Sequence, residues 1–331
     1  MTTYTDNAST FARVLRAKAL AGNVSGALEY AKANFGPNSQ AAKLLEKDIM
    51  GTWDLGTDAD VRAASRGFLD LVRSRSLLGK ISGWFRLPFE TPTLRQNQQL
   101  AASWVAEGKP IPLTISAFDR AKLEQRKIGS ILPVTVELLK GAGADFESAL
   151  NRVLSGAVAG LEAASLTDPL NAGVPDESPA SLTYGVTPVP GSTDPLADIE
   201  TLLDGFLGDL EASVLVTSPR AGLVLHSAGF ESTGVRGGDV AGLVHVTSGA
   251  VPDNRVILLD PTGIALADDG VILDTSEQGT LQLADSNGDP TDEYISLWQQ
   301  NLAAIKVVRY LNWLDLRGDS VAYTDSAQWV S

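Results

Sequence analysis

Three short stretches of the sequence carry residue types from which catalytic or ligand-binding sites are built. The run 236–242 (RGGDVAG) is rich in glycine, but it lacks the G-x-x-x-x-G-K-[ST] spacing and the lysine of a phosphate-binding loop. The run 286–292 (SNGDPTD) offers oxygen ligands suited to Ca²⁺, yet it does not match the ligand spacing of an EF-hand. Asp268 and Asp269 form a carboxylate pair in an LADDG segment, where a turn alone accounts for Asp and Gly. We therefore expect solvated turns at these places.

The histidines and the missing cysteines exclude several kinds of site. His226 and His245 both lie in apolar stretches (LVLHSAG and GLVHVTS) that we predict to be strands, and neither is paired with a serine and an acid at a recognisable spacing. The chain has no cysteine, which excludes disulfides, thiolate catalysis, iron–sulfur clusters and thiolate zinc sites. The aromatic residues are not interleaved with basic ones, so a stacking platform for single strands is unsupported. We expect no enzyme activity, no metal and no cofactor.

The charge of the 331-residue chain is unevenly distributed. The net charge is −14, but residues 1–140 carry 19 basic and 13 acidic side chains, whereas residues 141–331 carry 7 and 27. Three interpretations stay open: the basic half contacts nucleic acid, it contacts the acidic half of another copy, or it is a solvated face. The acidic bulk argues against a chain that wraps DNA as a whole.

Length and hydropathy bound the class of protein. About two domains are expected at this length. No apolar run reaches the ~20 residues that a membrane-spanning helix needs. The first ten residues (MTTYTDNAST) lack the pattern of a signal peptide, so we expect synthesis in the cytosol and no membrane partner.

The first 80 residues are predicted to be mostly helical. Apolar residues recur at helical spacing within residues 8–50, and the FGPNS stretch interrupts them. Asn38 or Ser39 is expected to cap a helix over residues 40–50. A further helix is predicted over residues 58–78, capped by Asp58 or Asp60.

Residues 81–135 change to alternating apolar and polar positions with interspersed prolines. Because proline donates no ladder hydrogen bond, these strands should lie at an edge or protrude. We predict a long two-stranded excursion whose two runs are joined through residues 96–102. Such a ribbon is barely stable alone, so it must lie on its own body or on a neighbouring subunit.

The rest of the chain has an α+β pattern. A helix over residues 137–140 ends at a Gly-Ala-Gly break, and Asp145 is the expected N-cap of the strongest helix, which extends to about residue 166. Residues 167–195 are rich in turn-forming residues. The following elements are a helix at 196–210, strands at 212–217, 242–247, 255–260 and 270–275, an amphipathic helix or strand at 296–316, and a strand at 320–324.

Taken in this order, the elements resemble the HK97-like major capsid proteins of tailed bacteriophages. Four stretches between about residues 81 and 324 carry the resemblance. They are Leu87-Pro88-Phe89 with Thr91 and the WVAEGKPIP run (104–112); ILPVTVELL (131–139) before the long helix; GLVHV (242–246), Val251-Pro252, the strand at 256–260 and LADDGVIL; and SLWQQNLAAIKVVRYLNW before GDSVAYT.

The resemblance implies an HK97-like α+β fold with four parts. It implies an N-terminal helical arm (1–80), an extended β-ribbon loop (81–130), a peripheral domain with a long spine helix (131–195 and 293–331), and an axial domain (196–292). It also implies that the N-terminal part is retained as an arm, with any scaffold a separate protein.

The resemblance also assigns residues to roles. Residues of the extended loop would contact a neighbouring subunit, with Trp104 as a buried anchor: Phe85, Pro88, Phe89, Trp104, Val105, Lys109, Pro110 and Pro112. The core of the spine helix would consist of Phe146, Leu150, Val153, Leu154, Val158 and Leu161. Tip loops of the axial domain would close rings of subunits through Gly234, Arg236, Gly238, Asp239, Asn287 and Asp289. Ala117 occupies the position of the lysine that cross-links subunits in some members, and Lys109 and Lys122 do not match it, so we expect no cross-link.

The function that follows from the resemblance is structural. It implies a major capsid protein that self-assembles through hexamers and pentamers into an icosahedral shell around phage double-stranded DNA, which it contacts non-specifically. The implied location is the virion, with assembly in the host bacterial cytoplasm, and the implied partners are further copies, portal and scaffold proteins and a cementing protein. Two alternatives stay open: an encapsulin-like nanocompartment shell of the same fold, and a hydrolase or nucleotide-binding enzyme that uses the Gly-rich and Asp-rich loops.

Overall fold

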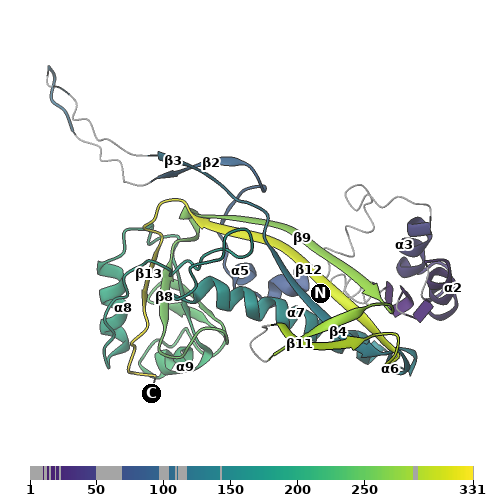
Figure 1. Ribbon diagram of the computed structural model, residues 1–331. Helices are drawn as coiled ribbons and strands as arrows, with labels where there is room; N and C mark the ends of the chain where they lie inside the picture. Colours follow the sequence, from purple (N-terminus) through teal and green to yellow (C-terminus); the bar gives the residue numbers. More distant parts are fainter. Residues whose placement is uncertain are drawn as a thin grey trace. The chain divides into compact units, whose positions relative to one another are not determined.

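Figure 1 shows a computed structural model of the chain. The structure describes residues 10, 13–14, 16–18, 20–21, 24–49, 69–96, 104–108, 110, 118–141, 144–285 and 290–330. The chain forms two compact units, and each unit is made of three separate segments of the sequence. The first unit draws on Met1–Arg75, Ile128–Ala159 and Gly270–Arg309, and the second on Ser76–Lys127, Gly160–Asp269 and Tyr310–Ser331.

The first unit has a helical part at its N-terminus. Residues 69–75 are helical, and the described residues before them include the helices α2 (Val24–Phe35) and α3 (Gln40–Ile49). Ser39 caps α3 as predicted, because its hydroxyl accepts from the Ala42 N–H at 3.2 Å. The predicted helix over 58–78 lies partly outside the described residues, and its end is interrupted at Ser76, which caps the short helix α5 (Leu77–Lys80) of the second unit.

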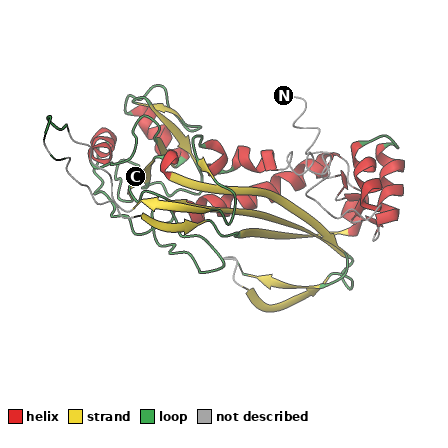
Figure 2. Ribbon diagram, turned by 90° about the horizontal axis from the view of Figure 1, so that it is seen from above, coloured by secondary structure: helices red, strands yellow, loops and turns green. Residues whose placement is uncertain are grey.

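Long strands supply a four-stranded sheet with the order β1-β9-β12-β4. Its members are β1 (Phe85–Arg86), β4 (Lys127–Thr135), β9 (Ile264–Ser276) and β12 (Leu302–Asp315). The strands β9 and β12 run side by side (Figures 1 and 2). The predicted strand at 270–275 is thus the second half of β9, and the ambiguous run at 296–316 is mainly strand.

Helices α6 (Val136–Gly141) and α7 (Ala144–Thr167) follow β4. The long helix was predicted, but Asp145 is not its N-cap because α7 begins one residue earlier. In the first unit, one face of α7 packs into an apolar core with β4, β12 and residues 69–72. This core consists of Leu44, Leu69, Val72, Val134, Val136, Leu139, Leu150, Leu154, Val158, Val271, Ala303, Ile305 and Val307.

The second unit contains a five-stranded sheet with the order β13-β8-β5-β7-β6. Its strands are β5 (Val214–Thr217), β6 (Gly238–Val240), β7 (Leu243–Thr247), β8 (Val256–Leu259) and β13 (Val321–Thr324), with helices α8 (Pro195–Asp204) and α9 (Pro219–Ser227) packed beside them. A 3-10 turn, η1 (Pro261–Gly263), joins β8 to β9. The sequence placed His226 in a strand, but it lies in α9, because Ser218 and Pro219 begin a helix there.

Two further two-stranded sheets complete the fold. The strands β10 (Thr280–Ala284) and β11 (Pro290–Ser296) form an antiparallel pair, and β2 (Pro92–Gln96) pairs with β3 (Phe118–Lys122). The second pair corrects the prediction for the ribbon. Its turn was placed at residues 96–102, but Gln96 lies opposite Phe118, so the strand that pairs with β2 begins 22 positions later in the chain. Alternation of apolar and polar residues identifies strands but does not fix which strand is the partner.

Candidate interaction surfaces

The β2–β3 ribbon presents one apolar and basic face to solvent. The register places Leu94 opposite Arg120 and Gln96 opposite Phe118, and Pro92 opposite Lys122. Because alternate residues of a strand share a face, Leu94, Phe118 and Arg120 lie together on one side of the ribbon. The side chains of all three are exposed. The ribbon therefore offers an uncovered face that combines aliphatic, aromatic and cationic groups.

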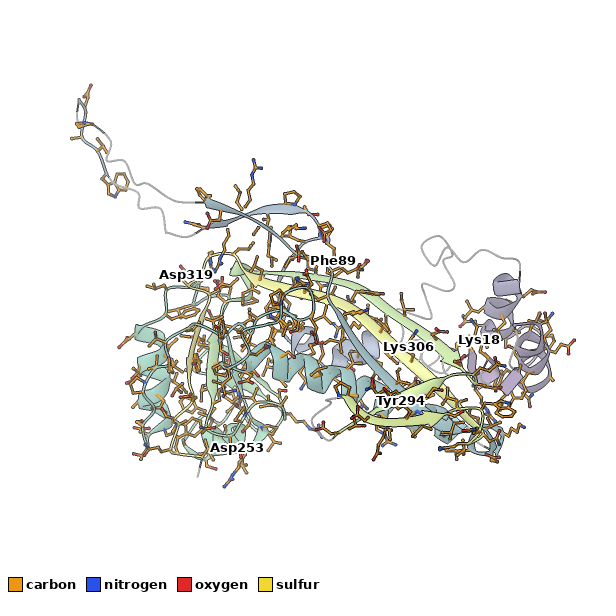
Figure 3. The ribbon with its side chains drawn as sticks, viewed as in Figure 1. Lys18, Phe89, Asp253, Tyr294, Lys306 and Asp319 are labelled. Carbon is orange, nitrogen blue, oxygen red and sulfur yellow. The ribbon has the colours of Figure 1, made fainter. Side chains whose placement is uncertain are left out.

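The base of the ribbon is fixed by contacts within the second unit. Leu123 is buried with Ala265 and Ala267, and Leu87 and Phe89 pack against this cluster. Figure 3 labels Phe89 at this position. The structure thus holds the base of the ribbon firmly while its outer face stays uncovered.

Ion pairs add to the anchoring of β3. The Lys122 ammonium group lies 3.0 Å from the Glu90 carboxylate and 3.1 Å from that of Glu124. The hydrogen bonds to Glu90 and then to Glu124 raise the pKa of Lys122 above its ordinary value. Arg126 continues the chain of charges, since it lies 2.7 Å from Glu124 and 3.4 Å from Asp176.

The residues that the sequence assigned to contacts of the extended loop fall into three groups. Phe85, Pro88, Trp104, Val105 and Pro110 are exposed, and Trp104 has no part of its side chain covered. Phe89 is half-buried against the cluster at the base of the ribbon. Lys109, Pro112 and the loop position Ala117 lie outside the described residues.

The residues predicted for the core of the long helix divide into buried and exposed positions. Leu150, Leu154 and Val158 are buried and Phe146 packs against them, but Val153 is 54% exposed and Leu161 is 53% exposed. Buried residues recur along α7 in adjacent pairs every four positions: 150 and 151, 154 and 155, 158 and 159, 162 and 163, 166 and 167. A step of four residues rotates about the helix axis by about 40° more than one full turn. The buried stripe therefore winds around the helix and leaves positions 153 and 161 outside it.

The first predicted tip loop is shorter than expected. Gly234 is half-buried and Arg236 is exposed in the loop, but Gly238 and Asp239 belong to β6 and pair with β7. Asn287 and Asp289 of the second predicted tip loop lie outside the described residues.

Both histidines hold the 230–237 loop. His226 Nδ1 lies 3.0 Å from the Thr233 carbonyl oxygen, while His245 Nδ1 bonds the Thr233 hydroxyl. His245 Nε2 lies 2.8 Å from Thr217 Oγ1, whose own proton is donated to the Ser218 carbonyl. Hence Nε2–H donates to Thr217, and Nδ1 accepts from Thr233. Burial lowers the pKa of His245 to about 4, so the ring is neutral near pH 7.

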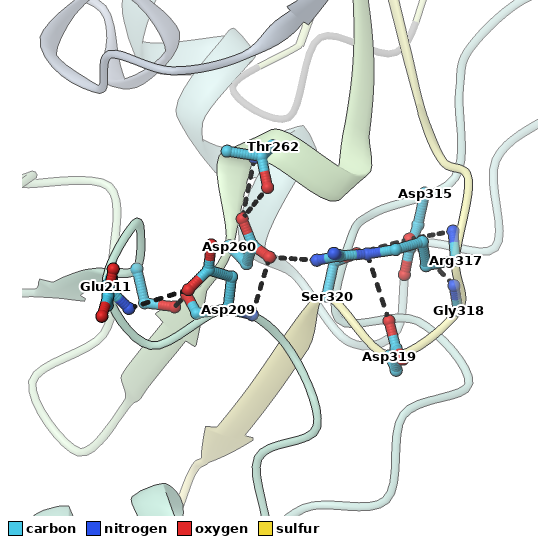
Figure 4. Close-up of polar contacts among 10 residues, drawn as sticks. Asp209, Glu211, Asp260, Thr262, Asp315, Arg317, Gly318, Asp319 and Ser320 are labelled. Atoms are coloured by element: carbon cyan, nitrogen blue, oxygen red, sulfur yellow. Dashed lines mark hydrogen bonds and ion pairs between the residues drawn. The ribbon is translucent and has the colours of Figure 1, made fainter. Parts of the chain in front are cut away.

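A buried carboxylate organises the other side of the same unit (Figure 4). Asp260 is fully buried and accepts from the Asp209 N–H at 2.9 Å, from Thr262 and from Arg317. Burial favours a raised pKa for Asp260, but the hydrogen bonds from Thr262, from the Asp209 N–H and from Arg317 outweigh it and hold the pKa below its ordinary value. Arg317 also lies 3.4 Å from Asp319. No short sequence motif predicts this cluster, because its members are up to about a hundred residues apart in the sequence.

The described residues show neither a metal site nor a membrane span. In that part of the chain no group of three or more His, Asp or Glu side chains is arranged to hold a metal ion. The helices described include none with the length and apolar content that crossing a bilayer requires.

Comparisons with known proteins find similarity to phage capsid proteins. A model of the phage capsid family matches residues 62–180, which include the ribbon and all of α7. A capsid polyprotein of Pseudomonas phage PAJU2 is 28% identical over 305 residues, which cover 84% of this chain and 46% of that relative. Residues 62–180 thus resemble the phage capsid family, and the chain is similar to a phage capsid polyprotein over most of its length. It spans about half the length of this capsid polyprotein.

Solved structures of phage chains resemble this chain in fold. A chain from Mycobacterium phage Adephagia is 13% identical, with a TM-score of 0.52, and the match covers 76% of this chain and 90% of the other. A chain from Mycobacterium phage Cain is also 13% identical, with a TM-score of 0.50 over 78% of this chain and 90% of the other. The predicted α+β class and the predicted resemblance to phage capsid proteins are confirmed.

Proposed function

We propose that this chain is a major capsid protein that assembles through hexamers and pentamers into an icosahedral shell around phage double-stranded DNA. The observation that carries the proposal is the uncovered apolar and basic face of the β2–β3 ribbon. A two-stranded ribbon is marginal by itself in water, and exposed aromatic and aliphatic groups on an anchored element are typical of an interface. The ribbon would become stable by lying on a neighbouring copy.

Charge supports a second copy as the occupant of this surface. The ribbon and its flanks (86–127) carry seven basic and four acidic residues, whereas residues 141–331 carry 7 basic and 27 acidic ones. A basic ribbon of one copy and an acidic body of the next would attract each other in a head-to-tail contact that can close rings. An acidic body would also leave packaged DNA weakly repelled rather than trapped.

The division into parts also belongs to the proposal. The N-terminal arm (1–80) and the extended loop (81–130) would lock neighbours together, while the peripheral domain with α7 would form the rigid body and the axial domain (196–292) would close rings. The subunit would act through assembly geometry, without catalysis, and its further partners would be portal, scaffold and cementing proteins.

Trp104 provides the direct test, because its side chain is fully exposed in the single chain. Trp104→Ala should leave the midpoint of urea unfolding unchanged and reduce the assembled fraction, measured by light scattering. Trp298→Ala is the matched control, since Trp298 is also largely exposed but lies outside the ribbon. Equal assembly of wild type and Trp104→Ala, or equal loss of folding and assembly, would contradict the anchor role.

A further inference from the structure

One arginine stands out in the second unit. Residues 160–269 contain only three basic residues, Arg220, Arg236 and Arg255. Arg255 donates to the Thr167 carbonyl at 3.0 Å, and Arg220 lies 3.6 Å from Asp253. Arg236 is exposed, and it makes no hydrogen bond or ion pair with any of the described residues. An arginine without an internal partner in a strongly acidic unit is available for a contact outside the chain.

The loop that carries Arg236 is held in one conformation. The Val235 carbonyl accepts from Thr247 Oγ1 at 2.9 Å, and the Gly237 N–H donates to the Gly234 carbonyl at 3.0 Å. The backbone of Gly237 has a φ of +90° and lies so close to the His245 carbonyl that a side chain would not fit. Arg236 is thus presented by a preorganised loop, which lowers the entropic cost of binding.

A second preorganised loop follows α8. Residues 205–213 are tied to buried Asp260 through the Asp209 N–H, and Ser213 Oγ donates to the Asp209 carbonyl (Figure 4). The loop exposes two leucines, Leu207 at 70% and Leu210 at 42%. The exposed carboxylates of Asp204 and Glu211 flank them, and residues 195–219 contain no lysine or arginine. Two exposed leucines between carboxylates form a surface suited to the aliphatic stem and the guanidinium group of an arginine.

The two loops lie apart on the five-stranded sheet, because the 205–213 loop leads into the central strand β5 and the Arg236 loop leads into the edge strand β6. They also lie at opposite ends of the strands, since Val214 pairs with Val244 whereas Val235 is bonded to Thr247 at the other end of β7. The sheet order places β13 at one edge and β6 at the other. The loop with Arg236 leads directly into β6, whereas α8 packs on β13, and Asp260 follows β8, the neighbour of β13 (Figure 1). One copy of the unit cannot bring these two surfaces together, but two copies side by side can.

We propose that Arg236 of one copy binds the 205–213 loop of a second copy, with its guanidinium group on Asp204 and Glu211 and its stem on Leu207 and Leu210. Because the two surfaces differ and lie apart on the unit, the contact is heterologous and propagates around a ring. This inference rests on the proposed function and adds the receiving surface, which the sequence did not indicate.

Charge reversal tests the contact in the full chain. Arg236→Glu and Glu211→Arg should each raise the subunit concentration at half-assembly by about tenfold or more, measured by mass photometry. The variant that carries both changes should regain ring formation. Arg220→Glu is the matched control, because Arg220 is an exposed arginine of the same unit with an internal partner, and it should assemble like wild type.

A mixture of the two single variants tests the head-to-tail geometry. A copy with Arg236→Glu repels other copies of the same variant, and so does a copy with Glu211→Arg, but each attracts the other variant at both of its surfaces. An equimolar mixture should therefore form rings in which the two variants alternate, with an even number of subunits and no pentamers. Urea unfolding of Arg236→Glu should match that of wild type, because Arg236 makes no contact in its own chain that the described residues reveal.

The outcomes separate the two proposals. If wild type forms rings or shells and Arg236→Glu assembles equally well, or if the double change restores nothing, the Arg236 contact is overturned while the proposed function stands. If wild type stays monomeric at every concentration, the proposed function itself fails.

Discussion

Acid should destabilise the subunit through His245, a group that lies in the centre of the second unit. The ring is buried between Thr217 and Thr233, and its pKa in the folded chain is about 4 against an ordinary value of 6.5. Between these two values the unfolded chain binds a proton that the folded chain does not. The stabilising contribution is therefore complete above pH 6.5 and is lost as the pH falls from 6.5 towards 4.

The magnitude follows from the two pKa values. The full difference between the two pKa values corresponds to about 3 kcal/mol of unfolding free energy. At pH 5 the unfolding free energy is lower than at pH 8 by about 2 kcal/mol. His245→Gln removes the titration while its amide can still donate to Thr217. Urea unfolding of unassembled subunits at pH 8 and pH 5 should show a loss for wild type that exceeds the loss for the variant by about 2 kcal/mol.

The comparison with the variant isolates the histidine, since the carboxylates titrate equally in both proteins. An equal loss of stability in wild type and His245→Gln between pH 8 and pH 5 would refute the reasoning, because it would mean that the ring accepts a proton in the folded chain as readily as in the unfolded one.

Further substitutions test three parts of the fold by urea unfolding. Asp260→Asn should cost about 3 kcal/mol, because it removes the charge that pairs with an arginine and fixes the 205–213 loop; unchanged stability would contradict that role. Gly237→Ala should cost more than Gly242→Ala, because both glycines have positive φ but only the first has a backbone carbonyl in the way. Leu154→Ala should cost about 3 kcal/mol and Val153→Ala under about 0.5 kcal/mol, since only Leu154 is buried.

Elements with a strong local signal could be predicted from the sequence. The long helix α7 follows from its apolar spacing, and the cap of α3 follows from Ser39. The strand β7 with buried His245 follows from a short apolar run. These features depend on the chain within a few residues, where helix periodicity and capping chemistry act.

Features that depend on distant residues could not be predicted. The partner of β2 begins at Phe118 because of long-range pairing, which the alternation in either strand does not encode. Leu161 fits the periodicity of α7 but is exposed, because the buried stripe winds around the helix. The polar cluster around Asp260 joins residues from three distant segments, and Arg236 was predicted as a tip-loop residue without its receiving surface.

The most direct test of the proposed shell is electron microscopy of the purified protein in negative stain, with static light scattering on the same sample. The account predicts closed shells, or rings of five and six subunits, and a scattering mass many times the 34.8 kDa of one chain. A uniform species with the mass of one chain over the whole range of accessible concentrations would contradict it.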